Sequence, residues 1–283
     1  MSSILILGAS GLLGRTLVDF FKDKNHTIGV LCRNPIHYTE PNIDVYSVDI
    51  LEYNSLDSII QKYETIINCT GQITNPINLS LLLNTDGISN IVKAVKKHDK
   101  RLIHISSVAV YGEAEYVNEE SPINPQTPYG SFKYFSEYLV RGSLENYSIL
   151  RVSNLFGKHQ EKGIISYLTK SYLNNTPNVH FNNDGSLKRY YLHIEDLSST
   201  INQIISKNLN GTYNIIGNEC LSIKELVHMF EDILEYKYYV EYSKDSAIEN
   251  IDKIDDFKIH NITKKALNVD VLEYIKDLKN EIF

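Results

Sequence analysis

The chain has 283 residues, a length that fits one large domain or two small ones. Hydrophobic residues make up 42% of the chain and its formal net charge at pH 7 is -7, so a sizeable core is available and binding to nucleic acid or to an anionic membrane is not expected. Three widely spaced cysteines, Cys32, Cys69 and Cys220, form no zinc motif and no disulfide framework. Without a signal-peptide pattern or an apolar run of about 20 residues, we expect a cytoplasmic protein with reduced thiols and no metal.

Strand and helix patterns alternate through the first half of the chain. The strands are expected at residues 4–7, 27–32, 45–48, 65–69, 101–105 and 148–152. The helices are expected at residues 12–24, 55–63, 79–97 and 129–144. This alternation is typical of an α/β protein with a doubly wound parallel sheet of the Rossmann type, covered by helices on both faces.

After residue 154 the pattern loosens. Helices are expected at 164–173, 196–206, 223–235 and 266–282, and strands at 190–194, 212–216 and 238–242. Ser222 and Glu225 have the spacing of a capping box for the helix that follows. We predict a dinucleotide-binding Rossmann domain over residues 1–155. A smaller, interleaved α/β lobe for the substrate should occupy residues 156–283, with about 190–218 returning to the first domain.

The first motif with chemical meaning follows the first expected strand. Gly8-Ala9-Ser10-Gly11-Leu12-Leu13-Gly14 joins that strand to a helical pattern. Glycines permit a tight turn and a close approach of the backbone to phosphate, while a helix N-terminus offers unpaired N–H groups and partial positive charge. The segment therefore predicts a site for the pyrophosphate of a dinucleotide. The expected contacts are Gly8, Ser10, Gly11, Leu12, Leu13 and Gly14.

The end of the second expected strand bears on the choice of cofactor. A carboxylate there would bind the adenine ribose and repel a 2′-phosphate, but this chain has Cys32 followed by Arg33. Because a guanidinium suits phosphate, we predict NADP in preference to NAD, unless Arg33 is only a surface charge or stacks on adenine. Asp49 and Ile50, after the third strand, are placed to hold the adenine edge, although Asp49 could equally cap a helix.

A phenol and an ammonium group lie four residues apart at Tyr129 and Lys133, within an expected helix. At this spacing the two side chains share a helix face, and a nearby cation lowers a phenol pKa from its usual value of about 10. Ser106 and Ser107 follow the strand at 101–105, at the sheet edge where ligands bind. A serine pair alone is ordinary turn chemistry, but with the phenol and ammonium it suggests a Ser-Tyr-Lys set for hydride transfer at a carbonyl.

With these motifs the chain resembles the extended short-chain dehydrogenase/reductases, a family of nucleotide-sugar epimerases, dehydratases and reductases. The resemblance runs through most of the chain. Besides the glycine-rich turn and the Tyr129/Lys133 pair, its segments are Ser106-Ser107 with Tyr111-Gly112, Leu150-Arg151-Val152-Ser153-Asn154-Leu155-Phe156-Gly157, Asp184-Gly185-Ser186, Arg189-Tyr190-Tyr191-Leu192-His193-Ile194-Glu195-Asp196 and Tyr213-Asn214-Ile215-Ile216-Gly217.

The resemblance assigns roles to residues at matching positions. It implies that Ser107 is the catalytic hydroxyl, Tyr129 the acid/base, and Lys133 its partner, which also holds the nicotinamide ribose. The further cofactor contacts that it implies are Cys69, Thr70, Gly71 and Ser153. The substrate contacts that it implies are Ser107, Asn154, His159 and Arg189. Asn84 matches a mid-helix asparagine that is frequent in the family.

Departures from the family pattern narrow the expected reaction. Sugar-nucleotide 4,6-dehydratases carry an Asp-Glu pair where this chain has Val108 and Ala109, so dehydration is not expected. The epimerase-reductases that make GDP-fucose have a histidine like His159, but place a cysteine at the position of Ala109. That double epimerisation is therefore doubtful, and His159 is left to contact substrate phosphate, line the cleft or lie on the surface. The 4-epimerases that recycle NAD usually have the acid replaced here by Cys32.

These features together predict an NADPH-dependent reductase of a nucleotide-linked keto-sugar, of the 4-keto-6-deoxyhexose type, that makes a deoxysugar precursor for surface polysaccharide. One alternative is an NAD(P)-dependent nucleotide-sugar 4-epimerase. A second is a non-enzymatic NADP-binding regulator on the same scaffold, and a third is a reductase of another small ketone. The nucleotide, sugar and product stereochemistry stay open, and a homodimer is the default assembly.

Overall fold

A computed structural model of the protein describes residues 2–34, 37–72, 74–243, 250–263 and 269–282. The chain forms two compact units, each built from three separate segments. The first unit contains Met1–Gly112, Ser121–Val152 and Ser198–Asn214. The second unit contains Glu113–Glu120, Ser153–Leu197 and Ile215–Phe283.

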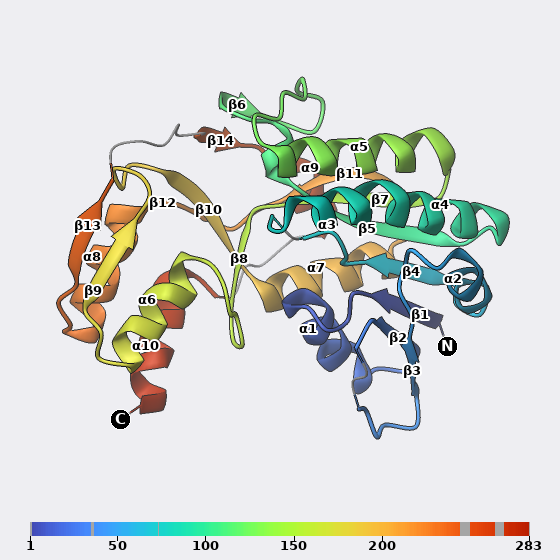
Figure 1. The fold of residues 1–283 in the computed structure, drawn as a ribbon, viewed down its shortest axis with the longest axis horizontal. Coiled ribbons are helices and arrows are strands. Elements are labelled where there is room, and N and C mark those ends of the chain that lie inside the picture. Colours follow the sequence, from blue (N-terminus) through green and yellow to red (C-terminus); the bar gives the residue numbers. More distant parts are fainter. Residues whose placement is uncertain (1, 35–36, 73, 244–249, 264–268, 283) are drawn as a thin grey trace. The chain divides into compact units, whose positions relative to one another are not determined.

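A seven-stranded sheet forms the centre of the first unit, in the order β11-β7-β5-β4-β1-β2-β3 (Figure 1). Its strands are β1 (Ser2–Leu7), β2 (His26–Cys32), β3 (Ile43–Ser47), β4 (Thr65–Asn68), β5 (Arg101–Ser107), β7 (Tyr147–Val152) and β11 (Gly211–Ile215). Every pairing from β7 across to β3 is parallel. The strand order reverses between β1 and β4, which is the doubly wound arrangement predicted from the sequence.

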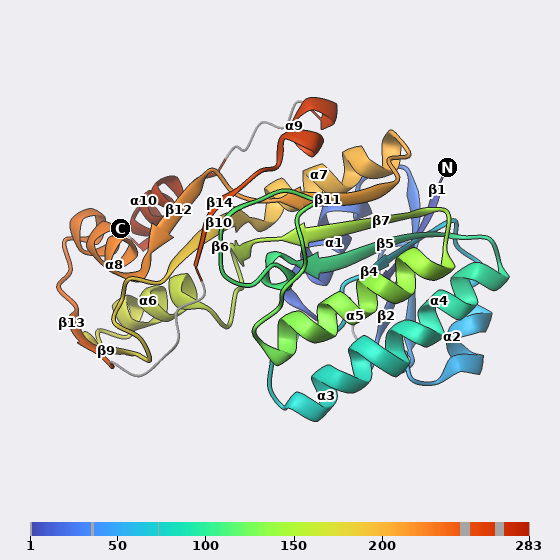
Figure 2. The same ribbon diagram turned by 90° about the horizontal axis from the view of Figure 1, so that it is seen from above.

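Helices cover both faces of this sheet (Figures 1 and 2). One face carries α2 (Tyr53–Ile60), α4 (Ile88–Lys97) and α5 (Pro128–Ser143), and the other carries α1 (Leu12–Lys22) and α7 (Ile194–Ser206). Successive strand residues point to opposite faces, so Leu5 and Leu7 pack in the core beneath α2, α4 and α5 while Ile4 and Ile6 are buried on the other side.

The single helix expected over residues 79–97 is instead interrupted. It consists of α3 (Ile77–Leu82), a π-helical turn (Leu83–Gly87) and α4. The turn contains Asn84, whose buried side-chain amide donates hydrogen bonds to the carbonyls of Ser80 (2.9 Å) and Gly71 (3.1 Å). Single π-helical turns are often found at functional sites, and this one fixes the loop that follows β4.

The second unit has three small sheets, with strand orders β12-β10-β8, β13-β9 and β14-β6. Its strands are β6 (Ala114–Val117), β8 (Asn154–Phe156), β9 (Asn178–Phe181), β10 (Lys188–His193), β12 (Glu219–Ser222), β13 (Tyr239–Tyr242) and β14 (Ile251–Ile254). Its helices are α6 (Ile164–Leu173), α8 (Ile223–Leu234), α9 (Phe257–Thr263) and α10 (Val271–Ile282). Phe156, Phe230 and Tyr238 are among the side chains of its core.

Several predicted features of the second unit are confirmed. The Ser222 hydroxyl and the Glu225 carboxylate form the predicted capping box at the start of α8. Of the helix expected over 266–282, α10 forms the later part, and residues 264–268 lie outside the described residues. The short strands β6, β8, β9, β12 and β14, and helix α9, were not predicted. Over the described ranges, no helix is long and apolar enough to cross a membrane.

Candidate active site

Helix α5 carries the phenol and the ammonium group, and its start is fixed by local sequence. Thr127 caps the helix by accepting a hydrogen bond from the Gly130 N–H (3.1 Å), and Pro128 occupies the first turn. At Gly130 an added Cβ would clash with the carbonyl oxygen of Ala109. The glycine thus lets the start of α5 pack closely against the segment that follows Ser107, the last residue of β5.

Lys133 is completely buried, with 0% of its surface exposed. Its ammonium group donates hydrogen bonds to the backbone carbonyls of Thr70 (3.2 Å), after β4, and Ile105 (3.1 Å), on β5. Burial lowers the pKa of Lys133 to about 7, although the charges of Cys69 and Glu137 act in the opposite direction. The lysine therefore changes its charge near neutral pH.

Tyr129 is half-buried, and its hydroxyl donates a 2.5 Å hydrogen bond to Oε1 of Gln72. Burial raises the pKa of Tyr129 above its usual value, while a hydrogen bond from Ser107 acts to lower it. The sequence led us to expect a lowered pKa beside Lys133. The direction is the opposite because removal from water disfavours the phenolate, a cost that the sequence spacing does not reveal.

Ser107 ends β5 and caps the short 3-10 turn Val108–Val110. Its Oγ accepts a hydrogen bond from the Ala109 N–H (3.2 Å), and its side chain also interacts with Tyr129. The three predicted catalytic residues, Ser107, Tyr129 and Lys133, thus lie in one corner of the first unit, around the carboxyl ends of β4 and β5.

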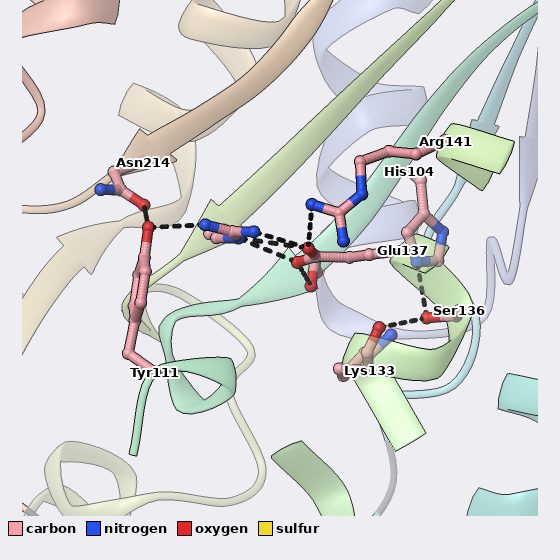
Figure 3. Close-up of polar contacts among 9 residues, drawn as sticks. His104, Tyr111, Lys133, Ser136, Glu137, Arg141 and Asn214 are labelled. Carbon is pink, nitrogen blue, oxygen red and sulfur yellow. Dashed lines mark hydrogen bonds and ion pairs between the residues drawn. The ribbon is translucent and has the colours of Figure 1, made fainter. Parts of the chain in front are cut away.

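Glu137, on the same helix as Lys133, belongs to a buried ion pair (Figure 3). Glu137, two helical turns from Tyr129 on α5, accepts hydrogen bonds from Nε and Nη2 of Arg151 on β7 at 2.8–3.2 Å. Its carboxylate also accepts from the Ser106 hydroxyl (2.6 Å). Burial opposes the charge of Arg151, but the hydrogen bonds and charge of Glu137 outweigh it and raise the Arg151 pKa. The guanidinium of Arg151 is therefore charged in the folded protein.

The network continues through Tyr111 to the edge of the sheet. Nη1 of Arg151 donates to the Tyr111 hydroxyl (2.8 Å), which donates in turn to Oδ1 of Asn214 on β11 (2.7 Å; Figure 3). The guanidinium also stacks over the Tyr111 ring, 4.9 Å from its centroid. This chain of contacts holds the segment after Ser107 against β7 and β11.

A second chain of buried polar groups lies on the other side of Lys133. Asn68 of β4 contacts Nδ1 of His104 (3.1 Å), and Nε2 of that histidine contacts the hydroxyl of Ser136 (3.0 Å). The Ser136 hydroxyl donates to the Lys133 carbonyl (2.7 Å; Figure 3). Burial and the nearby Lys133 hold the pKa of His104 well below its usual value, so this histidine is uncharged.

The glycine-rich turn has the geometry expected of a phosphate site. The N–H groups of Gly8 and Ala9 donate to the Leu31 carbonyl, and no side chain caps the first turn of α1 at Gly11. Gly8 has φ of +80°, and a Cβ at Gly14 would clash with the Gly8 carbonyl oxygen. The uncapped N–H groups of this turn are therefore accessible to an anion at close range, which fits a dinucleotide. Leu13 is buried in the core, so only its backbone can contribute.

The residues predicted to lie near the adenine of the cofactor have contacts that do not distinguish a cofactor site from other parts of a protein. Arg33 is exposed, and the Cys32 thiol is buried and donates to the Asn34 carbonyl (2.9 Å). The Asp49 carboxylate accepts a hydrogen bond from the Leu51 N–H (3.0 Å) in the turn ahead of α2, whose N-cap residue is Glu52, so Asp49 is not the cap of this helix. Ile50 is buried beside it.

The loop after β4 joins the two parts of the site. Cys69 is buried, and burial raises its thiol pKa to about 12. Thr70 donates from both its backbone N–H (3.0 Å) and its hydroxyl (2.6 Å) to the Asn68 side chain. Gly71 has φ of +73°, and an added Cβ there would clash with the Asn84 side chain. The loop is thus held rigidly beside both Lys133 and the glycine-rich turn: an added Cβ at Gly8 would lie 3.1 Å from the Thr70 side chain.

The remaining predicted site residues belong to the second unit. The Ser153 hydroxyl is buried, and no group of the residues that the structure describes forms a hydrogen bond with it. Asn154 on β8 lies opposite Tyr191 of β10, two positions along from Arg189, so Asn154 and Arg189 share one small sheet. Nη1 of Arg189 donates to the Lys188 carbonyl (2.8 Å). His159 is exposed, with φ of +65°.

Four contributors to the site were missed from the sequence. Glu137 lies four residues after Lys133, as Lys133 lies four residues after Tyr129. This spacing places Glu137 on the same helix face, so the sequence could have indicated that it belongs to the site. Arg151 lies in a segment that was noted without a role. Asn214 also lies in a segment that was noted without a role, and Gln72 gave no signal, because its contacts depend on how separate strands are brought together. Among the described residues, no cluster of histidine, cysteine or acidic side chains could hold a metal ion.

The doubly wound sheet, the glycine-rich turn and the Ser-Tyr-Lys corner define a dinucleotide-dependent enzyme of the oxidoreductase type. Residues 4–216 match the profile of the NAD dependent epimerase/dehydratase family, and the chain belongs to this family. The resemblance to the extended short-chain dehydrogenase/reductases is thereby confirmed.

Individual relatives have several different activities. A putative UDP-glucose 4-epimerase of Methanocaldococcus jannaschii is 28% identical over 266 residues, covering 85% of each chain. A dTDP-glucose 4,6-dehydratase of Mycolicibacterium smegmatis is 25% identical, covering 77% of this chain and 72% of its own. The fold also matches UDP-glucuronic acid 4-epimerase of Bacillus cereus, solved with UDP-glucuronic acid and NAD, with a TM-score of 0.86, 22% identity and coverage of 99% and 100%.

The buried ion pair leads to a prediction about stability. Replacing Glu137 by alanine leaves the Arg151 guanidinium buried without a counter-charge, so the free energy of unfolding should fall by about 3–5 kcal/mol. Urea unfolding measures this difference. Glu145→Ala, which removes an exposed carboxylate just beyond the same helix, should cost less than about 0.5 kcal/mol. Equal losses in the two variants would show that Glu137 does not have this structural role.

The depressed pKa of Lys133 predicts how stability depends on pH. The folded protein releases this proton near pH 7, whereas the unfolded chain keeps it up to about pH 10.5. Because the unfolded state binds more protons between these values, the lysine makes stability rise with pH in that window. Wild type should therefore gain stability relative to Lys133→Met between pH 7 and 10 in urea unfolding. A difference between the two proteins that is constant with pH would contradict this prediction.

Proposed function

We propose that the protein is an NADPH-dependent reductase of a nucleotide-linked keto-sugar of the 4-keto-6-deoxyhexose type. The observation that carries this proposal is the state of Tyr129. Its pKa is raised and its O–H donates a hydrogen bond to the side chain of Gln72, so the phenol is a neutral acid in the protein without ligands. Reduction of a carbonyl needs a proton donor at the start, whereas oxidation of an alcohol needs a base.

Each residue of the corner has a part in this chemistry. The nicotinamide cofactor would supply the hydride, and Gly8, Gly11 and Gly14 with the start of α1 would hold its pyrophosphate. Tyr129 gives its proton to the oxygen of the reduced carbonyl, and Ser107 donates a hydrogen bond to the same oxygen. Lys133, held by hydrogen bonds to two backbone carbonyls, would bind the nicotinamide ribose.

The contacts to the substrate and the product's use are also part of the proposal. We assign Asn154, His159 and Arg189 to the nucleotide-sugar, since an arginine suits a diphosphate by charge and geometry.

The side chains that follow Ser107 support reduction over dehydration. Val108 and Ala109 are apolar and cannot transfer a proton to expel water. The product would be a deoxysugar precursor for surface polysaccharide.

A 4-epimerase is the second candidate. It is favoured by the M. jannaschii relative, whose description is a putative UDP-glucose 4-epimerase. Such an enzyme would oxidise and then reduce the same carbon, with no net use of cofactor. The two candidates are therefore distinguished by whether NADPH is consumed in proportion to the sugar.

The reductase predicts a measurable consumption of NADPH. Purified protein and a panel of nucleotide-linked 4-keto-6-deoxy sugars are followed by nicotinamide absorbance, and one sugar should oxidise NADPH stoichiometrically. Tyr129→Phe should lower the rate by about 10²–10⁴-fold, because the proton donor is lost, while cofactor still binds. Tyr138→Phe, on the exposed side of the same helix, is the matched control and should keep full activity. If cofactor instead copurifies with the protein and NADPH is not consumed, the reductase proposal is wrong and the epimerase is favoured.

The choice of cofactor gives a separate prediction. If Arg33 binds the 2′-phosphate, Arg33→Ala should raise the KM for NADPH by about 10–100-fold, the size expected for a lost charged hydrogen bond. The KM for NADH should stay within about twofold, since NADH lacks that phosphate. Lys96→Ala removes an exposed cation on α4 and controls for the change in net charge. Equal effects on the two cofactors would remove the basis for preferring NADP.

A further inference from the structure

Gln72 contacts the Tyr129 phenol directly, and neither the Ser-Tyr-Lys set nor the predicted cofactor site includes it. Its Oε1 accepts the hydrogen bond from the Tyr129 hydroxyl at 2.5 Å, and its Nε2 donates to the Ile105 carbonyl at 2.8 Å. The backbone just before it is fixed, because the Gly71 carbonyl accepts a hydrogen bond from buried Asn84. The amide is therefore held at both ends.

The contact with the Ile105 carbonyl determines which way round the Gln72 side-chain amide lies. The Ile105 carbonyl can only accept hydrogen bonds, and it also accepts one from Lys133 (3.1 Å). If the Gln72 amide were turned over, Oε1 would face this carbonyl oxygen and two acceptors would repel each other. The amide oxygen consequently faces Tyr129, and the amide nitrogen faces β5.

An amide oxygen in that place distinguishes between the two states of the phenol. It can accept a hydrogen bond from the neutral phenol but has no hydrogen to donate to a phenolate, so it favours the protonated form of the phenol. Ser107 acts in the opposite direction. The other titratable groups of this corner are Lys133 one helical turn along α5, Cys69 after β4, His104 on β5, and Glu137. These four interact with one another through Lys133, whereas Gln72 and Ser107 contact the phenol itself.

We propose that Gln72 is a positioning residue that stands in for the carbonyl of the substrate, and keeps Tyr129 protonated and directed until that carbonyl replaces it. The chemistry of the two groups matches, since an amide C=O and a ketone C=O both accept one hydrogen bond from a phenol. Gln72 is exposed, so its side chain can turn out to solvent when a substrate arrives. The inference rests on the proposed function for the role of the proton, but the contact itself is independent of it.

The test is a titration of Tyr129 in the protein without ligands. 3,5-Difluorotyrosine placed at position 129 alone brings the phenol pKa into an accessible range, because fluorine withdraws electrons, and its ionisation is followed by ¹⁹F NMR. Gln72→Ala admits water, which can donate to a phenolate, whereas Gln72→Glu keeps an acceptor and adds negative charge. Gln61→Ala, at an exposed position just after α2, is the matched control. Circular dichroism confirms that each variant is folded.

The expected result is a shift in opposite directions. The apparent pKa of the fluorinated phenol should fall by about one pH unit in Gln72→Ala, a tenfold change in the ionisation constant, and rise in Gln72→Glu. Gln61→Ala should titrate as wild type does. Unchanged titration in both Gln72 variants, or a rise in Gln72→Ala, overturns the inference. If the shifts occur but no keto-sugar consumes NADPH, the proposed function fails while the control of the phenol by Gln72 stands.

Discussion

The carboxylate of Glu137 is the contact on which the rest of the first unit depends. It joins α5 to β7 through Arg151 and to β5 through Ser106. Arg151 in turn donates a hydrogen bond to Tyr111, which donates one to Asn214. A charge removed from water is stable only when its partners are complete, so these groups must reach their places together. Ser107 follows Ser106 directly, and Tyr129 and Lys133 lie on the same helix as Glu137. The corner that holds the three predicted catalytic residues is therefore connected directly to this buried ion pair.

Burial also determines the charges in this corner. The same close packing that places Lys133 against two backbone carbonyls lowers its pKa, and half-burial of Tyr129 raises the pKa of the phenol. At rest, the site therefore contains an uncharged phenol beside a lysine that is only partly charged at neutral pH. This is a site with little fixed charge of its own. Charge brought by bound ligands will accordingly have a large effect there, because the surroundings screen it poorly.

Much of this arrangement could be predicted from the sequence where a local pattern specifies a local structure. The apolar run 4–7, the glycine turn and the helix after it are specified by neighbouring residues, and so is the capping box at Ser222. The direction of the Tyr129 pKa could not be predicted, because spacing along a helix gives proximity to Lys133 but not the loss of water. Gln72 and Asn214 acquire their contacts only when β4, β5 and β11 assemble. The strands of the second unit, mostly four residues long, are too short for a period to be recognised.

The division of the chain into interleaved segments has a consequence for its synthesis. Tyr111 and Arg151 leave the ribosome before Asn214, which accepts the hydrogen bond of the Tyr111 hydroxyl, has been added. Until β11 is complete, β7 is an open edge strand, and the polar chain that ends at Asn214 lacks its last member. A nascent chain that stops before residue 214 therefore exposes the unpaired edge of β7 and a Tyr111 hydroxyl that is buried in the finished protein. An exposed strand edge is a feature that leads to aggregation and that chaperones bind. The first unit can reach its final form only after about three quarters of the chain have emerged, even though its glycine-rich turn is made first.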